Sequence, residues 1–209
     1  MDNIMQKLDE LRQKEIIRPI DLELCRFLRD RHPQISSEAL LAASLVSYLY
    51  QQGHVCLPLD EYAGQAIFDD ERIETTLKAP ALDSWRSALV ECPAVGTPGD
   101  YKPLILDDSD RLYMHKLWHY ERTLAQELVK RSRQQDENID NSLLRDGLNR
   151  LFSESSQQPD WQQVAAATSV LNNLSIISGG PGTGKTSTVV RVLALILEQY
   201  RDREKKLHV

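Results

Sequence analysis

The sequence is poor in cysteine and in long apolar runs. Its three cysteines, Cys25, Cys56 and Cys92, lie far apart without a C-x-x-C pair, so the spacing indicates neither a disulfide framework nor a thiolate metal site. No apolar run reaches the roughly eighteen residues of a membrane span, and the first residues lack the pattern of a signal peptide. The sequence therefore predicts a cytoplasmic protein with no membrane partner.

An excess of basic residues is also missing. The 25 lysines and arginines are outnumbered by 31 aspartates and glutamates, which gives a formal net charge of -6. This balance argues against a protein whose whole surface binds nucleic acid, although local basic patches remain open. With 41% hydrophobic and 27% charged residues, the 209-residue chain is of the ordinary globular class, and its length suits one large domain or one and a half smaller ones.

Helical spacing of apolar residues dominates the first two thirds of the chain. The third predicted helix is apolar nearly all round and should form the buried centre of the first domain. An acidic turn, 107–110, lacks the glycine and final glutamate of a calcium loop, so we assign it no metal. The predicted helices lie near 2–16, 19–28, 38–52, after 60, 83–90 and 115–134. Ser36 or Ser37 should cap the third of these, Asp60 the fourth and Asp83 the fifth. Residues 104–106 and 111–114 should form a β-hairpin.

A glycine-rich motif stands out near the end of the chain. It fits the phosphate-binding pattern G-x-x-x-x-G-K-[ST], in which backbone N–H groups surround a phosphate. Lys185 can reach the β- and γ-phosphates, and the Thr186 hydroxyl can bind Mg²⁺. An apolar segment, 174–178, predicts a buried parallel strand before the motif, and apolar residues over 189–197 predict a helix after it. The sequence thus predicts an ATP or GTP site, with a ligand-free turn as the alternative, at Gly179, Gly180, Pro181, Gly182, Thr183, Gly184, Lys185 and Thr186.

Another helix is predicted just before this motif, with Asp160 as its cap. It carries a Gln-x-x-Ala pattern in Gln162 and Ala165, which resembles the start of the motor core of superfamily 1 helicases. In those proteins the glutamine contacts adenine through its amide donor and acceptor. Gln162 is the matching position, and Gln163 is the alternative if the register differs by one.

The resemblance to one helicase family extends over nearly the whole chain. The sequence resembles the RecD family, the alpha subunits of bacterial exonuclease V (RecBCD), whose members are ATP-driven 5′-to-3′ DNA helicases in double-strand break repair and homologous recombination. The resemblance implies ATP and Mg²⁺ as cofactors, RecC and RecB as partners, a catalytic Lys185, and single-stranded DNA as the track of the parent motor. It rests on 53–59, 111–113, 117–118, Glu121, 160–167 and 176–186.

These patterns predict two domains. Residues 1–140 should be a mostly α N-terminal domain with a small β-hairpin, and the polar stretch 153–159 lies near the boundary. The family resemblance implies that this domain docks RecC. Residues 141–209 should be the first strand, loop and helix of a P-loop (RecA-like) α/β motor domain. We expect this motor to be incomplete, because no acidic Mg²⁺-binding strand or arginine finger follows the motif and 207–209 resembles the start of another strand.

We therefore expect this fragment alone to be inactive in hydrolysis. Two alternatives stay open. The chain could be an interaction module that docks RecC and carries an inert P-loop, or an unrelated P-loop ATPase or kinase with a helical accessory domain.

Overall fold

The computed structural model of the protein describes residues 3–68, 70–72, 77–134, 138–152 and 159–201. The chain divides into two compact units, Met1–Arg122 and Thr123–Val209, here called the N-terminal and C-terminal units. This division falls inside a helix, α6 (His115–Ser132), whereas the domain boundary expected from the sequence lies after residue 140.

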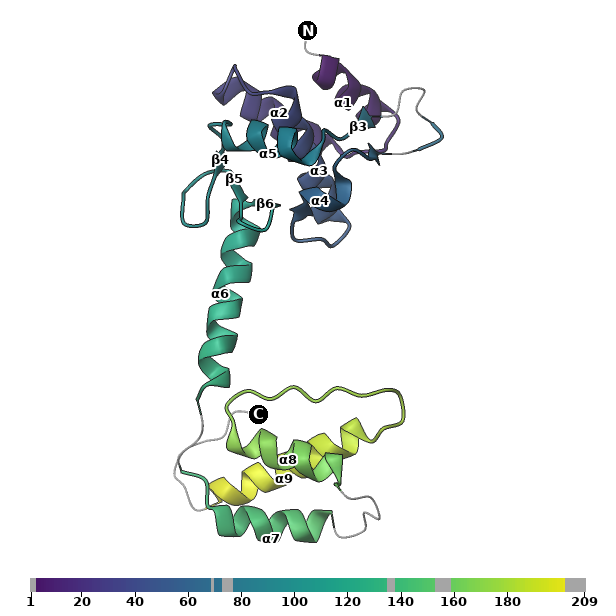
Figure 1. Cartoon of the computed structure of the whole chain (residues 1–209). Coiled ribbons are helices and arrows are strands. Elements are labelled where there is room, and N and C mark those ends of the chain that lie inside the picture. The colour runs from purple at the N-terminus through teal and green to yellow at the C-terminus, as the bar shows by residue number, and fades with distance from the viewer. Residues whose placement is uncertain (1–2, 69, 73–76, 135–137, 153–158, 202–209) are drawn as a thin grey trace. The chain divides into compact units, whose positions relative to one another are not determined.

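Three helices build the centre of the N-terminal unit: α1 (Asn3–Gln13), α2 (Pro19–Arg31) and α3 (Ser37–Gln51) (Figure 1). Ser36 caps α3, because its side chain accepts a hydrogen bond from the Ala39 N–H at 3.1 Å, as the sequence predicts. The predicted burial of α3 is also confirmed, since most of its residues from Ala39 to Leu49 are buried. The helix packs against α1, α2 and α5 (Leu82–Val90), so it is the middle of this core.

A small sheet completes the N-terminal unit. The predicted hairpin is present, with β5 (Leu104–Leu106) antiparallel to β6 (Arg111–Met114). The sequence did not predict β4 (Val95–Gly96), which lies parallel to β5, because two residues show no periodicity. The remaining elements of this unit are β1 (Leu57–Pro58), which pairs with β6, the pair β2 (Ala66–Ile67) and β3 (Leu77–Lys78), and α4 (Leu59–Tyr62).

Two predicted caps lie inside their helices. Asp60 is in the first turn of α4, and Asp83 is in the first turn of α5. The partial positive charge of a helix N-terminus favours a carboxylate throughout the first turn, so sequence spacing alone does not separate these positions from a cap.

A buried carboxylate ties α2 to α3. Asp21 is fully buried and accepts hydrogen bonds from the Arg18 N–H at 2.8 Å, the Ser47 hydroxyl at 2.5 Å and the Gln51 amide at 2.5 Å. These donors offset the cost of removing the carboxylate from water. Burial, helped by the nearby charge of Asp21, raises the pKa of the Cys25 thiol to about 12.

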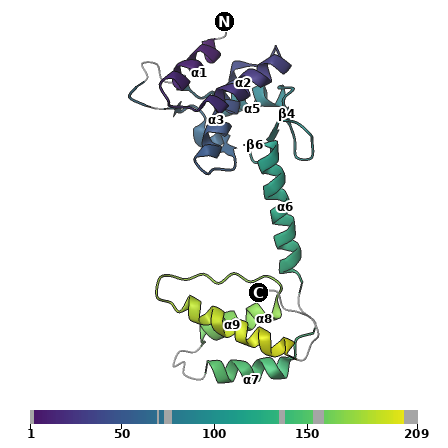
Figure 2. The ribbon, with the colours of Figure 1, turned by 180° about the vertical axis from the view of Figure 1, so that it is seen from behind.

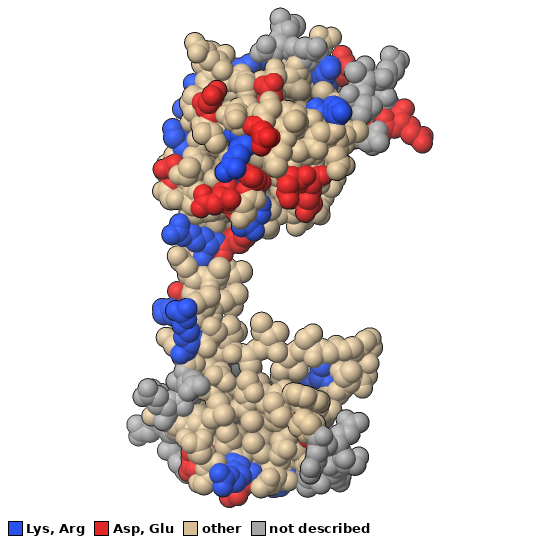
Figure 3. All heavy atoms as spheres, viewed as in Figure 1, with Lys and Arg blue, Asp and Glu red and all other residues tan. Residues whose placement is uncertain are grey.

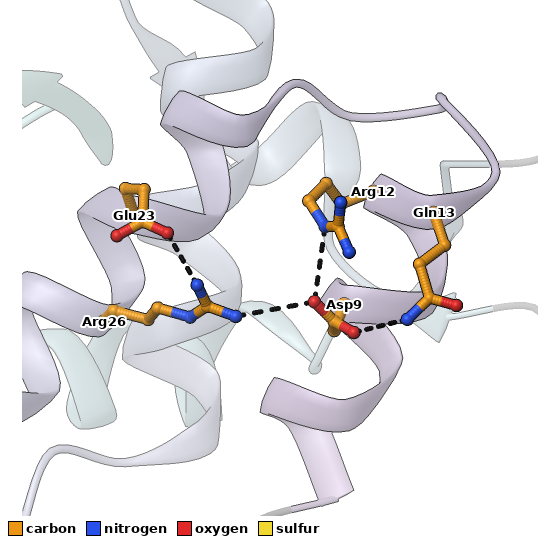
Figure 4. Close-up of polar contacts among 5 residues, drawn as sticks. All are labelled: Asp9, Arg12, Gln13, Glu23 and Arg26. Atoms are coloured by element: carbon orange, nitrogen blue, oxygen red, sulfur yellow. Dashed lines mark hydrogen bonds and ion pairs between the residues drawn. The ribbon is translucent and has the colours of Figure 1, made fainter.

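On the surface, α1 and α2 meet through polar side chains (Figure 4). Asp9 accepts from Arg12 at 3.3 Å and from Gln13 at 2.6 Å, while Arg26 contacts Glu23 at 2.6 Å and Asp9 at 3.5 Å. The charged side chains here are one third or more exposed, so each ion pair contributes at most about 1 kcal/mol. The apolar core therefore dominates the packing of α1 on α2.

The C-terminal unit is a cluster of helices around its own core. The helices α7 (Asn141–Leu151), α8 (Trp161–Leu171) and α9 (Lys185–Tyr200) pack against one another, as Figures 1 and 2 show from opposite sides. Gly147 allows α7 to approach α9, since a Cβ there would lie 2.5 Å from Leu195 Cδ2. The buried residues of this core are Leu144, Phe152, Ala166, Val170, Val192 and Leu195.

The predicted strand 174–178 is not formed. The structure assigns these residues to no strand, and Ile176 is 86% exposed. A strand needs a hydrogen-bonded neighbour, and both sheets of the described residues belong to the N-terminal unit. The prediction of a buried strand at 174–178 is therefore wrong. The predicted linker residues 153–158 and the predicted strand start 207–209 lie outside the described residues.

Candidate nucleotide-binding site

The glycine-rich motif forms a loop that leads directly into α9. Gly182 and Gly184 have φ of +76° and +78°, in the left-handed region that favours glycine. α9 begins at Lys185, with Gly184 at its N-cap, and none of the described side chains caps it. The first N–H groups of α9 thus remain available beside the positive end of the helix dipole, an arrangement that suits a phosphate.

Lys185 folds back over the loop. Its ammonium donates hydrogen bonds to the carbonyl oxygens of Gly179 at 2.5 Å and Gly180 at 2.6 Å. The Thr183 hydroxyl also donates to the Gly180 carbonyl, at 2.9 Å. A Cβ on Gly179 would lie 2.7 Å from Thr183 Oγ1, so the turn closes tightly only with glycine there. The loop therefore holds the Lys185 ammonium next to the uncapped N-terminus of α9.

The remaining motif residues lie on the outside of the loop and at the start of the helix. Pro181 is exposed, and Thr186 is the second residue of α9 and also exposed. The glycine cradle, the ammonium and an accessible hydroxyl fit the phosphates of a nucleotide and an associated Mg²⁺. Lys185 would hold the phosphate, and Thr186 would hold the metal.

The glutamine predicted from the helicase pattern lies against this loop. Asp160 caps α8 as predicted, because its carboxylate accepts from the Gln162 N–H at 2.9 Å and the Gln163 N–H at 3.3 Å. The side chain of Gln162 donates from Nε2 to the Thr183 carbonyl at 3.2 Å. A Cβ on Gly184 would lie 2.6 Å from the same Nε2. Between the two glutamines, Gln162 is the one with a recorded side-chain contact to the described loop.

Sequence reasoning missed Arg191. Its guanidinium donates from Nη1 to Gln162 Oε1 at 3.4 Å and lies 4.7 Å from the centre of the Phe152 ring. The sequence feature that could have identified it is that Arg191 is the one charged residue in the apolar stretch 189–197. That stretch was interpreted only as an apolar helix that follows the motif.

Outside the loop, the described residues form no second group of side chains suited to a metal ion. Acidic and basic side chains are interspersed over the face of the N-terminal unit in Figure 3, and the described residues contain no group of three or more potential metal ligands. In the acidic turn, Asp107 accepts from the N–H groups of Ser109 at 3.0 Å and Arg111 at 2.9 Å. Over the described ranges, every helix is too short or too polar to cross a bilayer.

Known families match both units. Residues 13–113 match the family described as "RecBCD enzyme subunit RecD, N-terminal domain", and residues 162–208 match "AAA domain". A RecBCD enzyme subunit RecD of Haemophilus influenzae is 30% identical over 229 aligned residues, which cover 100% of this chain and 34% of the relative. The chain belongs to the RecD family.

Other relatives of this RecD-family chain carry the same name. The RecD subunit of Mycolicibacterium smegmatis is 30% identical over 88% of the chain and 30% of the relative, and that of Buchnera aphidicola from Schizaphis graminum is 26% identical over 97% and 33%. The chain thus spans about a third of the length of these relatives. The match to the AAA domain begins at Gln162 and includes the glycine-rich loop.

Proposed function

We propose that this chain belongs to an ATP-driven DNA helicase subunit of a RecBCD-type complex and binds the Mg²⁺-nucleotide of that motor. The observation that carries the proposal is the loop 179–184, which places Lys185 and the uncapped start of α9 at one point. The RecD names of the relatives and the match to an AAA domain support it.

On nucleotide binding, the Lys185 ammonium exchanges two neutral carbonyl acceptors for anionic phosphate oxygens. The phosphate oxygens add a Coulomb attraction between opposite charges that the neutral carbonyls lack, so this exchange is favourable. The first N–H groups of α9 and the loop backbone surround the same phosphates. Thr186 would contribute a hydroxyl ligand to Mg²⁺, which when bound supplies positive charge beside the phosphates.

Gln162 supplies the base contact in this proposal. Its amide lies beside the loop, on the Thr183 carbonyl, so one side chain touches both the base and the phosphate cradle. Hydrolysis and 5′-to-3′ movement along single-stranded DNA need groups that position water and balance charge beyond this cradle. We assign hydrolysis and movement along DNA to the whole motor together with its RecB and RecC partners. In this proposal the complex acts in the cytoplasm, in double-strand break repair and homologous recombination.

Binding of the Lys185→Gln variant tests the nucleotide site. Titration calorimetry with Mg²⁺ and ATP on the whole chain should show at least a tenfold loss, because a charge-assisted bond of about 1.5–3 kcal/mol is removed. Lys130→Gln is the matched control, since Lys130 is an exposed lysine that contacts Glu127 at 3.7 Å on α6. Equal affinities for ATP in the wild type and Lys185→Gln would refute the proposal. In the assembled complex, the same variant should lose unwinding.

A second candidate function is docking of RecC by the N-terminal unit. It is favoured by one observation: the match to the RecD N-terminal domain, 13–113, lies entirely within Met1–Arg122. Capture of purified RecC by the Lys185→Gln chain would support docking that is independent of nucleotide. If neither the wild type nor this variant captured RecC, docking would be excluded.

A further inference from the structure

We infer that Arg191 determines which nucleobase the site accepts, by fixing the orientation of the Gln162 amide. The inference rests on the proposed function, in which Gln162 faces the base. It assigns to Arg191 a positioning role that the glycine-rich motif does not contain. The chemistry of the two contacts to the amide carries the argument.

The neighbours of the Gln162 side chain distinguish its two ends. The carbonyl of Thr183, 3.2 Å away, can only accept a hydrogen bond, so the end facing it is the NH₂ group. The guanidinium of Arg191, 3.4 Å away, can only donate, so the end facing it is the oxygen. A flipped amide would place donor against donor and acceptor against acceptor. The two contacts therefore specify one orientation.

The oriented amide has hydrogen-bonding capacity left. An NH₂ group has two hydrogens and an amide oxygen has two lone pairs, and the contacts to Thr183 and Arg191 use one of each. One N–H and one lone pair therefore remain, on the two adjacent ends of one amide. Adenine presents the matching pair, an acceptor at N7 and a donor at its 6-amino group, whereas guanine presents two acceptors, N7 and O6. The Gln162 oxygen then meets O6 of guanine as acceptor against acceptor.

Arg191 is itself held in place. Its guanidinium lies over the ring of Phe152 at 4.7 Å, and Phe152 is 6% exposed in the core of the C-terminal unit. A guanidinium on an aromatic face is attracted to the ring and loses little further freedom when it forms one more hydrogen bond. Phe152 follows α7 as its C-cap residue, Arg191 lies on α9 and Gln162 lies on α8, so all three helices of the core support this contact.

Nucleotide selectivity of Arg191 variants tests the inference. The dissociation constants of ATP and GTP, each with Mg²⁺, are measured by titration calorimetry on the whole chain. The wild type should prefer ATP by about tenfold or more, because mismatched polar groups in a site are costly. Arg191→Met should reduce this ratio by about five- to tenfold, mainly through weaker ATP binding. Arg191→Lys keeps a donor and should retain the preference. Arg145→Met, an exposed arginine on α7, is the control.

The outcomes separate this inference from the proposed function. If Arg191→Met weakened ATP and GTP equally, or if the wild type bound both alike, the inference would be wrong while a Lys185-dependent site would stand. If Lys185→Gln left ATP affinity unchanged, the proposed function itself would fail. Should circular dichroism show that Arg191→Met does not fold, Arg191→Gln replaces it. A glutamine there can present either end of its amide, so it imposes no orientation and the ratio should fall in the same way.

Discussion

Replacing Gly184 with alanine perturbs the site in two separable ways. The first is backbone strain, since φ is +78° and an alanine in the left-handed region costs about 1–2 kcal/mol. The second is a steric conflict, because the new Cβ would lie 2.6 Å from Gln162 Nε2. The glutamine must move, which breaks its hydrogen bonds to the Thr183 carbonyl and to Arg191.

Gly182→Ala is a matched control for the first effect. Gly182 has nearly the same φ, +76°, but a Cβ there meets nothing within 4 Å among the described atoms. Both variants carry the strain, and Gly184→Ala also loses two hydrogen bonds of about 0.5–1.5 kcal/mol each. We therefore expect Gly184→Ala to destabilise the nucleotide-free C-terminal unit by about 1–3 kcal/mol more than Gly182→Ala.

Hydrogen exchange read by mass spectrometry measures this difference locally. Peptides from α8 and α9 report the free energy of opening of these helices, without assuming that the two units unfold together. In the double variant Gly184→Ala/Gln162→Ala the conflict is absent, so the extra cost of the alanine should disappear. Equal protection in Gly182→Ala and Gly184→Ala, or an extra cost that persists without the Gln162 side chain, would refute the reasoning.

Three further predictions concern buried groups in the two cores. Gln199 is 6% exposed; its side chain accepts a hydrogen bond from the Asp140 N–H at 2.8 Å and donates one to the Asp140 carbonyl at 3.1 Å. Gln199→Leu should therefore lower the free energy of unfolding of the C-terminal unit, measured in urea, by about 2 kcal/mol. Asp21→Ala leaves three donors without their acceptor and should cost the N-terminal unit about 3 kcal/mol or more, whereas a loss below about 1 kcal/mol would contradict the hydrogen bonds described. Because Cys25 is buried and its pKa is raised to about 12, its thiol should resist iodoacetamide in the native state at about pH 9. Burial also raises the pKa of Cys56, but this thiol is only half-buried and should react faster than Cys25. The stability associated with Cys25 is fully present below the ordinary thiol pKa of about 8.5 and is lost as the pH rises towards 12.

The sequence by itself determined the features that depend on near neighbours along the chain. Helical spacing predicted the main helices, and the caps Ser36 and Asp160 were recognised because a capping side chain bonds an N–H two or three residues away. The hairpin of β5 and β6 and the glycine-rich loop are likewise local, since each is specified by a few consecutive residues. The family resemblance followed from the same local motifs and was confirmed.

Only the tertiary structure decided which distant residues meet. Residues 174–178 have the composition of a strand, but a strand exists only beside a partner, so the apolar pattern alone did not show that none forms there. The parallel pairing of β4 with β5 gave no signal for the same reason. Arg191 lies 29 residues from Gln162, and its contact arises because α8 packs against α9. Side-chain packing between helices thus joins the predicted glutamine to a residue that no motif identifies.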